Sequence, residues 1–199
     1  MIGGGVSTGS ETRDDIHNAN ITRRPRILLM GLRRSGKTSI QQVIFTKMQP
    51  SQTQFLESTA RLTTKQYSCG SFIHFQVQEL PGQMNAFPLV NHSAIGTGQL
   101  ISQQDETNYL AAGGYDIDRL LKNSHAVVYI IDAQDDYTEA VGRLNLIIQS
   151  GRRVNQKLRY EVFIHKVDQL SEEAKLETQR DIHNQVEYFC LSFDTMYFP

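Results

Sequence analysis

The fold of this chain is decided by the segment Gly31-Leu32-Arg33-Arg34-Ser35-Gly36-Lys37-Thr38. It matches the phosphate-binding loop pattern of Gly, four residues, Gly, Lys, and Ser or Thr. Glycines in such a loop let backbone N–H groups turn toward phosphate oxygens, and the helix that follows presents its positive end to the same anion. Lys37 adds a mobile charge, and Thr38 can place its hydroxyl on a magnesium ion. The segment therefore favours a nucleoside triphosphate site over a glycine-rich surface turn.

The flanking residues supply the strand and the helix that such a loop requires. Residues 26–31 form a short apolar run that ends in glycine, which is typical of a strand buried on both faces of a parallel sheet. After the loop, apolar side chains recur at spacings of three and four, as on one face of a helix that Pro50 ends: Ile40, Val43, Ile44 and Met48.

Further strands and helices alternate along the chain. Strands are predicted at residues 61–69, 72–78, 126–131 and 160–164, the first of them as an antiparallel edge partner of the second. A charged helix is predicted over 171–187 with Ser171 as its N-cap, and an earlier one from the apolar stripe Ala140, Val141, Leu144, Ile147 and Ile148. This alternation predicts an α/β fold with a mostly parallel, doubly wound sheet.

Two segments stand outside this pattern. Residues 1–24 carry too little apolar surface to offset the entropy of ordering them, so we expect a disordered N-terminal tail. Residues 88–114 show no sustained period and are expected to form a long polar loop or insertion. Residues 25–199 are then expected to form one domain. The chain reaches Pro199 directly after the apolar segment 188–193, without the covering helix that such a sheet normally has.

The composition excludes several classes of function. With 20 Lys+Arg against 21 Asp+Glu, the net charge of -1 supplies no broad basic field for nucleic acid or anionic lipid. No apolar stretch approaches the roughly 18 residues that span a bilayer, and the first ten residues lack the basic start and apolar core of a signal peptide. Cys69 and Cys190 are too few for a disulfide framework, and both are expected to be small buried side chains. We therefore expect a cytoplasmic protein without direct membrane insertion.

A second motif, Glu79-Leu80-Pro81-Gly82-Gln83, follows the strand predicted at 72–78. The carboxyl ends of parallel strands form the edge of the sheet where ligands bind, so this motif is expected beside the phosphate loop. Glu79 could hold a magnesium-bound water, the Gly82 N–H could meet the terminal phosphate, and Gln83 could orient an attacking water. Taken alone, the motif is equally consistent with a Pro-Gly turn between solvated side chains.

A third motif, His165-Lys166-Val167-Asp168, ends the strand predicted at 160–164. A carboxylate at Asp168 can accept two parallel hydrogen bonds from the N1–H and 2-amino group of guanine, which adenine cannot donate in that arrangement. The stem of Lys166 could lie along the base, and His165 could bond either the base or the phosphate loop. The competing interpretation is an exposed Lys–Asp pair without a ligand.

The motifs together resemble a Rag GTPase of the RagC/RagD type. The resemblance covers roughly residues 26–87 and 115–193 and is carried by the blocks 26–38, 55–59, 81–84, 129–137 and 161–168. Histidine at position 165, where most small GTPases have asparagine, is typical of Rag proteins. The resemblance implies a Ras-like P-loop NTPase fold, Mg²⁺-dependent binding of GTP and GDP, and slow GTP hydrolysis.

The resemblance also implies roles for individual residues. Gln83 is implied as the catalytic, water-positioning residue, and the metal site as Thr38, Thr59 and Glu79. The nucleotide-binding residues implied are Arg33, Arg34, Ser35, Gly36, Lys37, Thr38, Thr59, Gly82, His165, Lys166 and Asp168. The implied partners are a RagA/RagB-type GTPase in an obligate heterodimer and components of the TOR kinase complex, to which amino-acid sufficiency is signalled at the lysosomal or vacuolar surface.

The chain departs from the family pattern in three respects. Glu79 stands where the family has Asp, and its extra methylene is expected to displace a water ligand and to weaken metal binding. Residues 88–114 exceed the length of the family's second switch. The last helix and the C-terminal dimerisation domain are expected to be absent.

Two alternatives remain open from the sequence. Asp132 ends a buried strand and could hold magnesium water in an ATP-using P-loop kinase or ATPase, although bonding loop amides is its more common role. The other alternative is a nonhydrolysing, nucleotide-binding partner subunit.

Overall fold

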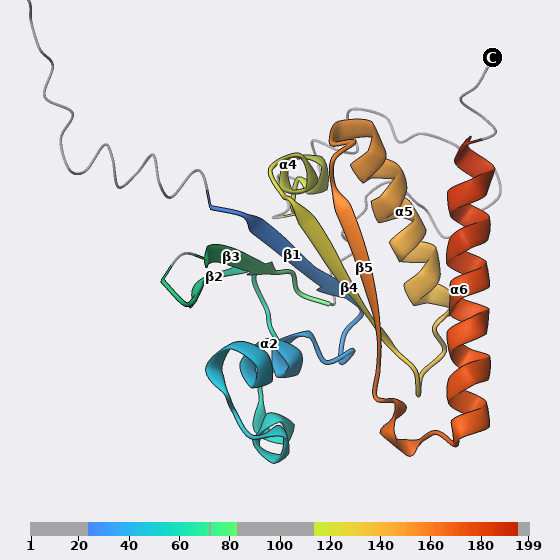
Figure 1. Cartoon of the computed structure of the whole chain (residues 1–199), viewed down its shortest axis with the longest axis horizontal. Helices are drawn as coiled ribbons and strands as arrows, with labels where there is room; N and C mark the ends of the chain where they lie inside the picture. Colours follow the sequence, from blue (N-terminus) through green and yellow to red (C-terminus); the bar gives the residue numbers. More distant parts are fainter. Residues whose placement is uncertain (1–23, 72, 83–113, 195–199) are drawn as a thin grey trace, which may run out of the picture.

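The computed structural model describes residues 24–71, 73–82 and 114–194 (Figure 1). A five-stranded sheet runs through them in the order β2-β3-β1-β4-β5. Its strands are β1 (Arg26–Gly31), β2 (Thr63–Cys69), β3 (Ile73–Glu79), β4 (Ala126–Asp132) and β5 (Arg159–His165). All neighbours are parallel except β2, which runs antiparallel to β3. The predicted mostly parallel sheet with one antiparallel edge strand is confirmed.

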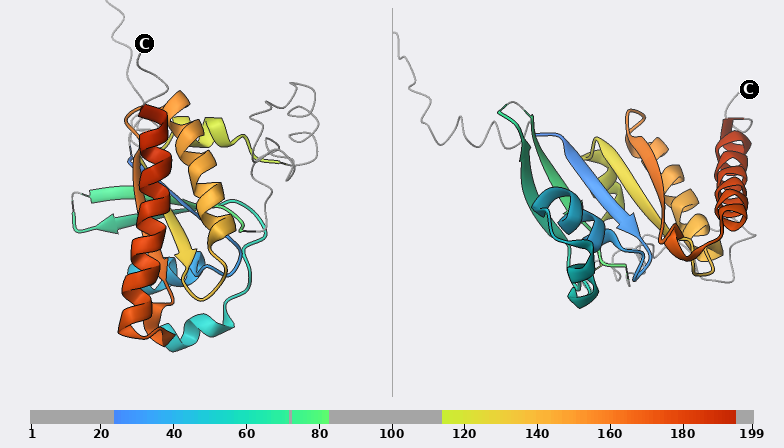
Figure 2. Two further views of the ribbon diagram at one scale, coloured as in Figure 1. Left: turned by 90° about the vertical axis from the view of Figure 1, so that its right-hand side faces the viewer. Right: turned by 60° about the horizontal axis from the view of Figure 1, so that its bottom comes forward.

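The helices lie on both faces of the sheet, as a doubly wound fold requires (Figure 2). One face carries α2, and the opposite face carries α4, α5 and α6. The bounds are α2 (Lys37–Thr46), α4 (Ile117–Lys122), α5 (Thr138–Val154) and α6 (Glu172–Asp194), with short 3-10 helices η1 (Pro50–Phe55) and η2 (Val167–Gln169). The fold is therefore the α/β arrangement predicted.

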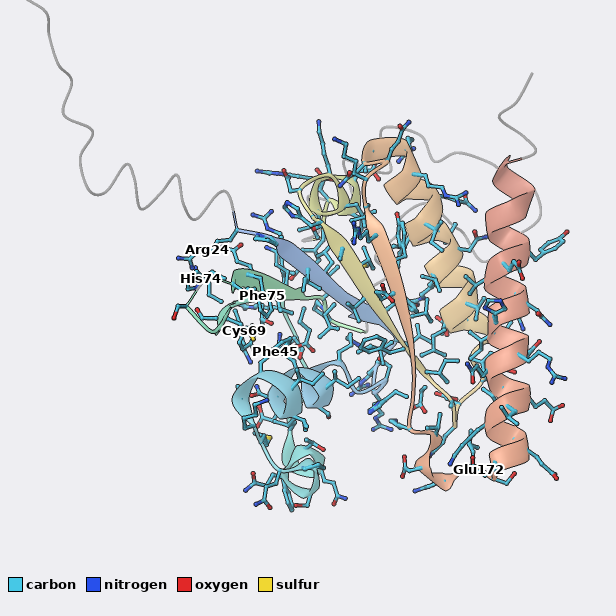
Figure 3. All side chains as sticks on the ribbon, in the orientation of Figure 1. Arg24, Phe45, Cys69, His74, Phe75 and Glu172 are labelled. Carbon is cyan, nitrogen blue, oxygen red and sulfur yellow. The ribbon has the colours of Figure 1, made fainter. Side chains whose placement is uncertain are left out.

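Two hydrophobic cores of unequal size fill the space between the layers. The larger joins β1 and β4 to α4, α5 and α6, and its members include Leu28, Val127, Ile131, Leu121, Ile147 and Ile182. On the α2 face, the described residues Leu29, Val77 and Ile130 form a smaller buried cluster. An aromatic group extends that smaller core, because Phe45 of α2 stacks on Tyr67 at 4.4 Å and meets Phe75 edge-on at 5.4 Å (Figure 3).

Helix boundaries depart from the predictions in three places. Ser171 does cap α6, since its Oγ accepts a hydrogen bond from the Ala174 N–H at 3.2 Å, but the helix continues past residue 187 to Asp194. Residues 172–194 contain no proline or glycine, so nothing ends it earlier. Helix α2 ends at Thr46 because Lys47 takes a left-handed conformation, with φ 59°, before Pro50 is reached. Helix α4 was not predicted; the Asp116 side chain caps it.

The prediction that Cys69 is buried is wrong. Cys69 is exposed because it ends the edge strand β2, next to the turn into β3 (Figure 3). The side chain of Cys190, the expected tail 1–24 apart from Arg24, and the expected insertion 88–114 apart from Gly114 lie outside what the structure describes. Among the described residues, no helix is long and apolar enough to cross a bilayer.

Two glycines of α5 make a matched test of helix packing. A Cβ at Gly142 would meet no atom within 4 Å, so Gly142→Ala is expected to raise the free energy of unfolding by about 0.5–1 kcal/mol through helix propensity. A Cβ at Gly151 would lie 1.8 Å from the Tyr160 hydroxyl oxygen, so Gly151→Ala is expected to lower it by about 1–3 kcal/mol. Urea unfolding measures both, and shifts of the same sign would contradict the packing described.

Candidate nucleotide-binding site

The phosphate loop connects the end of β1 to the start of α2, as predicted. Its backbone bends through left-handed conformations at Gly31 (φ 141°), Arg34 (φ 64°) and Gly36 (φ 94°). A Cβ at Gly31 would lie 2.3 Å from the carbonyl oxygen of Ile130 in β4, so only glycine allows this strand end to lie against its neighbour. The sequence pattern thus has a steric cause in the fold.

Lys37, the first residue of α2, is folded back over the loop. Its ammonium donates hydrogen bonds to the carbonyl oxygens of Gly31 at 2.9 Å and Leu32 at 2.7 Å. Burial lowers the pKa of Lys37 to about 8, and the Glu79 carboxylate opposes this shift. The charge is therefore held at the loop in an environment that disfavours it, and an anion would relieve that cost.

Three oxygen ligands come together beside the loop. The hydroxyl oxygens of Thr38 and Thr59 lie 3.0 Å apart. Both hydroxyls donate to the same oxygen, Oε1 of Glu79, with the bond from Thr59 at 3.1 Å. Glu79 is only 1% exposed. The three residues predicted for a metal site are thus in mutual contact, although they come from α2, the segment before β2 and the end of β3.

These ligands suit a hard cation. Carboxylate and hydroxyl oxygens, completed by phosphate oxygens of a nucleotide, are the donors that Mg²⁺ prefers. In the described part of the chain, no group of three His, Cys, Asp or Glu side chains is placed to hold a metal. Because of their oxygen donors, Thr38, Thr59 and Glu79 would be the residues that hold the cation, which would neutralise charge on the phosphates.

The segment after β3 lies directly on the phosphate loop. The Leu80 N–H donates to the Leu29 carbonyl at 3.1 Å, which continues the line of β3 along β1. A Cβ at Gly82 would lie 2.4 Å from the Arg33 backbone nitrogen and 2.5 Å from its Cα. Gly82 therefore sits where its N–H was expected, next to the loop. Gln83 lies outside the described residues, and its role stays a prediction.

His165 connects the loop after β5 to the phosphate loop. Its Nδ1 lies 3.0 Å from the carbonyl oxygen of Ser35. A Cβ at Gly36 would lie 2.3 Å from the same nitrogen, so glycine is needed for the ring to lie here. Of the two contacts expected for His165, the ring therefore makes the one with the phosphate loop. Asp168, in η2, is exposed beyond it.

Lys166 is held by Asp132, the last residue of β4, and by Gln134 in the loop that follows. Its ammonium pairs with Oδ2 of Asp132, and its carbonyl accepts a hydrogen bond from the Gln134 side-chain amide at 2.7 Å. Asp132 Oδ1 also accepts from the Gln134 N–H at 3.1 Å. These contacts hold Lys166 in a left-handed conformation, with φ 61°.

The contacts of Asp132 decide between its two predicted roles. Its carboxylate bonds loop groups, whereas Thr38 and Thr59 bond Glu79, so the magnesium role needed by the ATP-using alternative has no support here. Gln134 was missed because a single glutamine in a loop forms no pattern. The only signal was its place inside the block 129–137.

A phosphate loop after β1, an acid at the end of β3 and the His-Lys-Val-Asp segment at the end of β5, on a mostly parallel sheet, define a Ras-like P-loop G domain. The comparison with protein families makes this more specific. The chain matches the Gtr1/RagA G protein conserved region over residues 26–97 and 98–197, and it belongs to this family.

Individual relatives agree with this assignment. The chain is 45% identical to Ras-related GTP-binding protein C of Homo sapiens over 162 residues, which are 81% of the chain and 35% of that protein. It is 41% identical to GTP-binding protein gtr2 of Schizosaccharomyces pombe over 165 residues, which are 82% of the chain and 44% of that protein. The chain thus spans less than half the length of these relatives. The predicted resemblance to the RagC/RagD type is confirmed.

Gly82→Ala tests whether the segment after β3 senses the terminal phosphate. The added methyl group would collide with the Arg33 backbone and move the Gly82 N–H away from the loop. Loss of one hydrogen bond to a charged phosphate predicts roughly 10-fold to 100-fold weaker GTP binding, with GDP binding nearly unchanged. Fluorescence titration measures both affinities, and Gly142→Ala is the control. Equal effects on GTP and GDP would contradict the prediction.

Proposed function

We propose that this chain is the GTP-binding domain of a Rag-type switch that hydrolyses GTP slowly. The observation that carries the proposal is the contact of His165 with Ser35 and Gly36, because it joins the predicted base site to the phosphate site. A nucleotide whose phosphates occupy the loop would extend its base toward Asp168. Family membership and relatives that are named GTP-binding proteins support the same conclusion.

The first experiment identifies the nucleotide. The chain is purified and denatured, the released nucleotides are separated, and the affinities for GTP, GDP and ATP are then measured with magnesium present. We expect GDP or GTP to co-purify and ATP to bind at least about 100-fold more weakly, since adenine cannot make the paired hydrogen bonds with Asp168. Equal affinities for GTP and ATP would support the ATP-using alternative.

Hydrolysis needs a separate test, because the alternative of a nonhydrolysing subunit shares every binding feature. In the proposal Gln83 orients the attacking water and Gly82 holds the segment against the loop. Single-turnover hydrolysis of GTP is expected to be slow but measurable, and Gln83→Leu is expected to slow it further while GTP binding stays nearly intact. No hydrolysis by the parent chain, alone or with an activating partner, would favour the nonhydrolysing subunit.

The proposal extends to partners and location through the family. The chain would pair with a RagA/RagB-type GTPase, relay amino-acid sufficiency to components of the TOR kinase complex, and reach the lysosomal or vacuolar surface through these partners. Mg²⁺ is its proposed cofactor. Co-expression with a RagA-type subunit, followed by affinity purification in GTP-loaded and GDP-loaded forms, tests the pairing. Failure of both loaded forms to associate would contradict it.

A further inference from the structure

We propose that Glu79 is a direct ligand of the bound divalent cation, and that it replaces a water which a shorter carboxylate would hold. The inference rests on the proposed function, because it concerns the cation that accompanies the nucleotide. It gives this chain a metal face made entirely of protein oxygens, from Thr38, Thr59 and Glu79.

The spacing of the three oxygens carries the inference. Neighbouring ligands of an octahedral Mg²⁺, each about 2.0–2.1 Å from the metal, lie about 2.9 Å apart. The Thr38 and Thr59 hydroxyl oxygens are 3.0 Å apart, and Thr59 Oγ1 is 3.1 Å from Glu79 Oε1. The third side of the triangle, between Thr38 Oγ1 and Glu79 Oε1, is also a direct contact. The two separations that involve Thr59 therefore match those of neighbouring ligands in the metal's shell, and the contact between Thr38 and Glu79 closes the triangle.

The alternative is a carboxylate outside the shell that contacts the cation through water. Oε1 of Glu79 contacts the hydroxyls of both Thr38 and Thr59. It therefore lies where a third ligand of the metal would complete a triangle with the two hydroxyl oxygens, rather than next to only one of them. The additional methylene of glutamate supplies the reach of roughly one carbon–carbon bond that this position needs. Direct carboxylate ligation is also an ordinary way for proteins to hold Mg²⁺.

Burial and charge support the direct contact. Glu79 is 1% exposed, and a buried carboxylate is costly unless a positive charge lies close to it. Lys37, which is folded back over the phosphate loop, supplies part of that charge. When the Lys37 ammonium turns to the phosphates, a cation bound at Glu79 would take over the compensation. The sequence predicted weaker metal binding because the longer Glu79 side chain would displace a water ligand. If the charged Glu79 oxygen itself takes the place of that neutral water, its attraction for the cation offsets this loss.

The experiment counts the waters on the metal. The full chain is loaded with Mn²⁺ and a nonhydrolysable GTP analogue, and the electron paramagnetic resonance line is recorded in ¹⁷O-enriched water, which broadens the line for each bound water. If the two threonine hydroxyls and two phosphate oxygens are ligands, two octahedral positions remain. We expect the parent chain to hold one water, and Glu79→Asp to hold one more. Glu161→Asp, at an exposed glutamate of β5, is the matched control and is expected to leave the count unchanged.

The outcomes separate this inference from the proposed function. Bound Mn²⁺ with two waters in the parent chain would overturn direct ligation and leave the proposed function standing. The count in the parent alone decides this, so the test does not depend on how well Glu79→Asp folds. Absence of nucleotide-dependent Mn²⁺ binding would overturn both.

Discussion

Replacing Lys37 by Met is expected to weaken GTP binding by roughly 100-fold or more. Methionine has a similar length but supplies neither a charge nor a donor to the phosphates, and losing such a charge-assisted contact costs about 3 kcal/mol. Fluorescence titration with a labelled nucleotide measures the effect. Lys47→Met, at an exposed lysine directly after α2, is the control and is expected to bind as the parent does.

The same substitution is expected to stabilise the nucleotide-free chain. Burial lowers the pKa of Lys37 from 10.5 to about 8, so near pH 7 the folded chain holds a charge that its surroundings disfavour. Above pH 8 the folded state releases this proton while the unfolded state keeps it up to about pH 10.5, so the unfolded state binds more protons and stability rises with pH in that window. The shift corresponds to a few kcal/mol, about 3 at most, that Lys37→Met recovers near neutral pH.

Urea unfolding between pH 7 and 10.5 measures this linkage in the absence of nucleotide. The parent chain should gain stability across the window, and Lys37→Met should start higher and lack that gain. Lys47→Met should follow the parent. A variant that still binds GTP like the parent, or that keeps the rise with pH, would show that Lys37 is not the buried cation of the phosphate site.

Asp168→Asn is expected to change which base is preferred. In the proposed site the carboxylate would accept two hydrogen bonds from guanine, whereas an asparagine amide would oppose the 2-amino group and would donate to the 2-oxo group of xanthine. A site built to hydrogen-bond its substrate rejects a mismatched one by roughly 10⁴-fold, so the ratio of GTP to xanthosine triphosphate affinities should shift by about that factor. Asp168 is exposed in η2, so the substitution removes no core packing.

Competition binding with the two nucleotides measures the ratio. Asp136→Asn is the matched control, because Asp136 is exposed in the loop after β4 and its Oδ1 accepts a hydrogen bond from the Thr138 N–H, which an asparagine oxygen can also accept. It should leave the preference unchanged. Equal losses for both nucleotides in Asp168→Asn would argue that the loop has a structural role without selecting the base.

The strands and the phosphate loop could be predicted because their determinants are local. An apolar run such as 126–131 indicates a buried strand, and the glycines of the loop indicate its backbone conformation. Both signals lie within a few neighbouring residues of the sequence. The apolar stripe of α5 was predicted correctly for the same reason: its residues Ala140, Val141, Leu144, Ile147 and Ile148 are all buried.

What could not be predicted depends on contacts between distant residues. The end of α6 at Asp194 is not marked by any breaker, so the apolar run 188–193 was not recognised as the last turns of that helix. The contact of Thr59 with Glu79 joins segments twenty residues apart and was expected only through the resemblance to Rag GTPases. The contact of Gln134 with Lys166, which joins the loops after the neighbouring strands β4 and β5, was not expected. Cys69 is exposed because it lies on the edge strand β2. That edge position was predicted, and the error came from treating a free cysteine as a small buried side chain.

The unequal cores have a consequence for how the chain opens in solution. Among the described residues, the fully buried apolar cluster on the α2 side consists of Leu29, Val77 and Ile130, while the larger cluster fixes α4, α5 and α6. Local opening should therefore require the least free energy around α2 and β2, and amide protons there should exchange with deuterium well before those of β4 and α5. Because α2 begins at Lys37, a bound nucleotide would slow amide exchange most strongly in α2. The difference in exchange rate between α2 and the better-packed α5 would then be smaller in the nucleotide-bound chain.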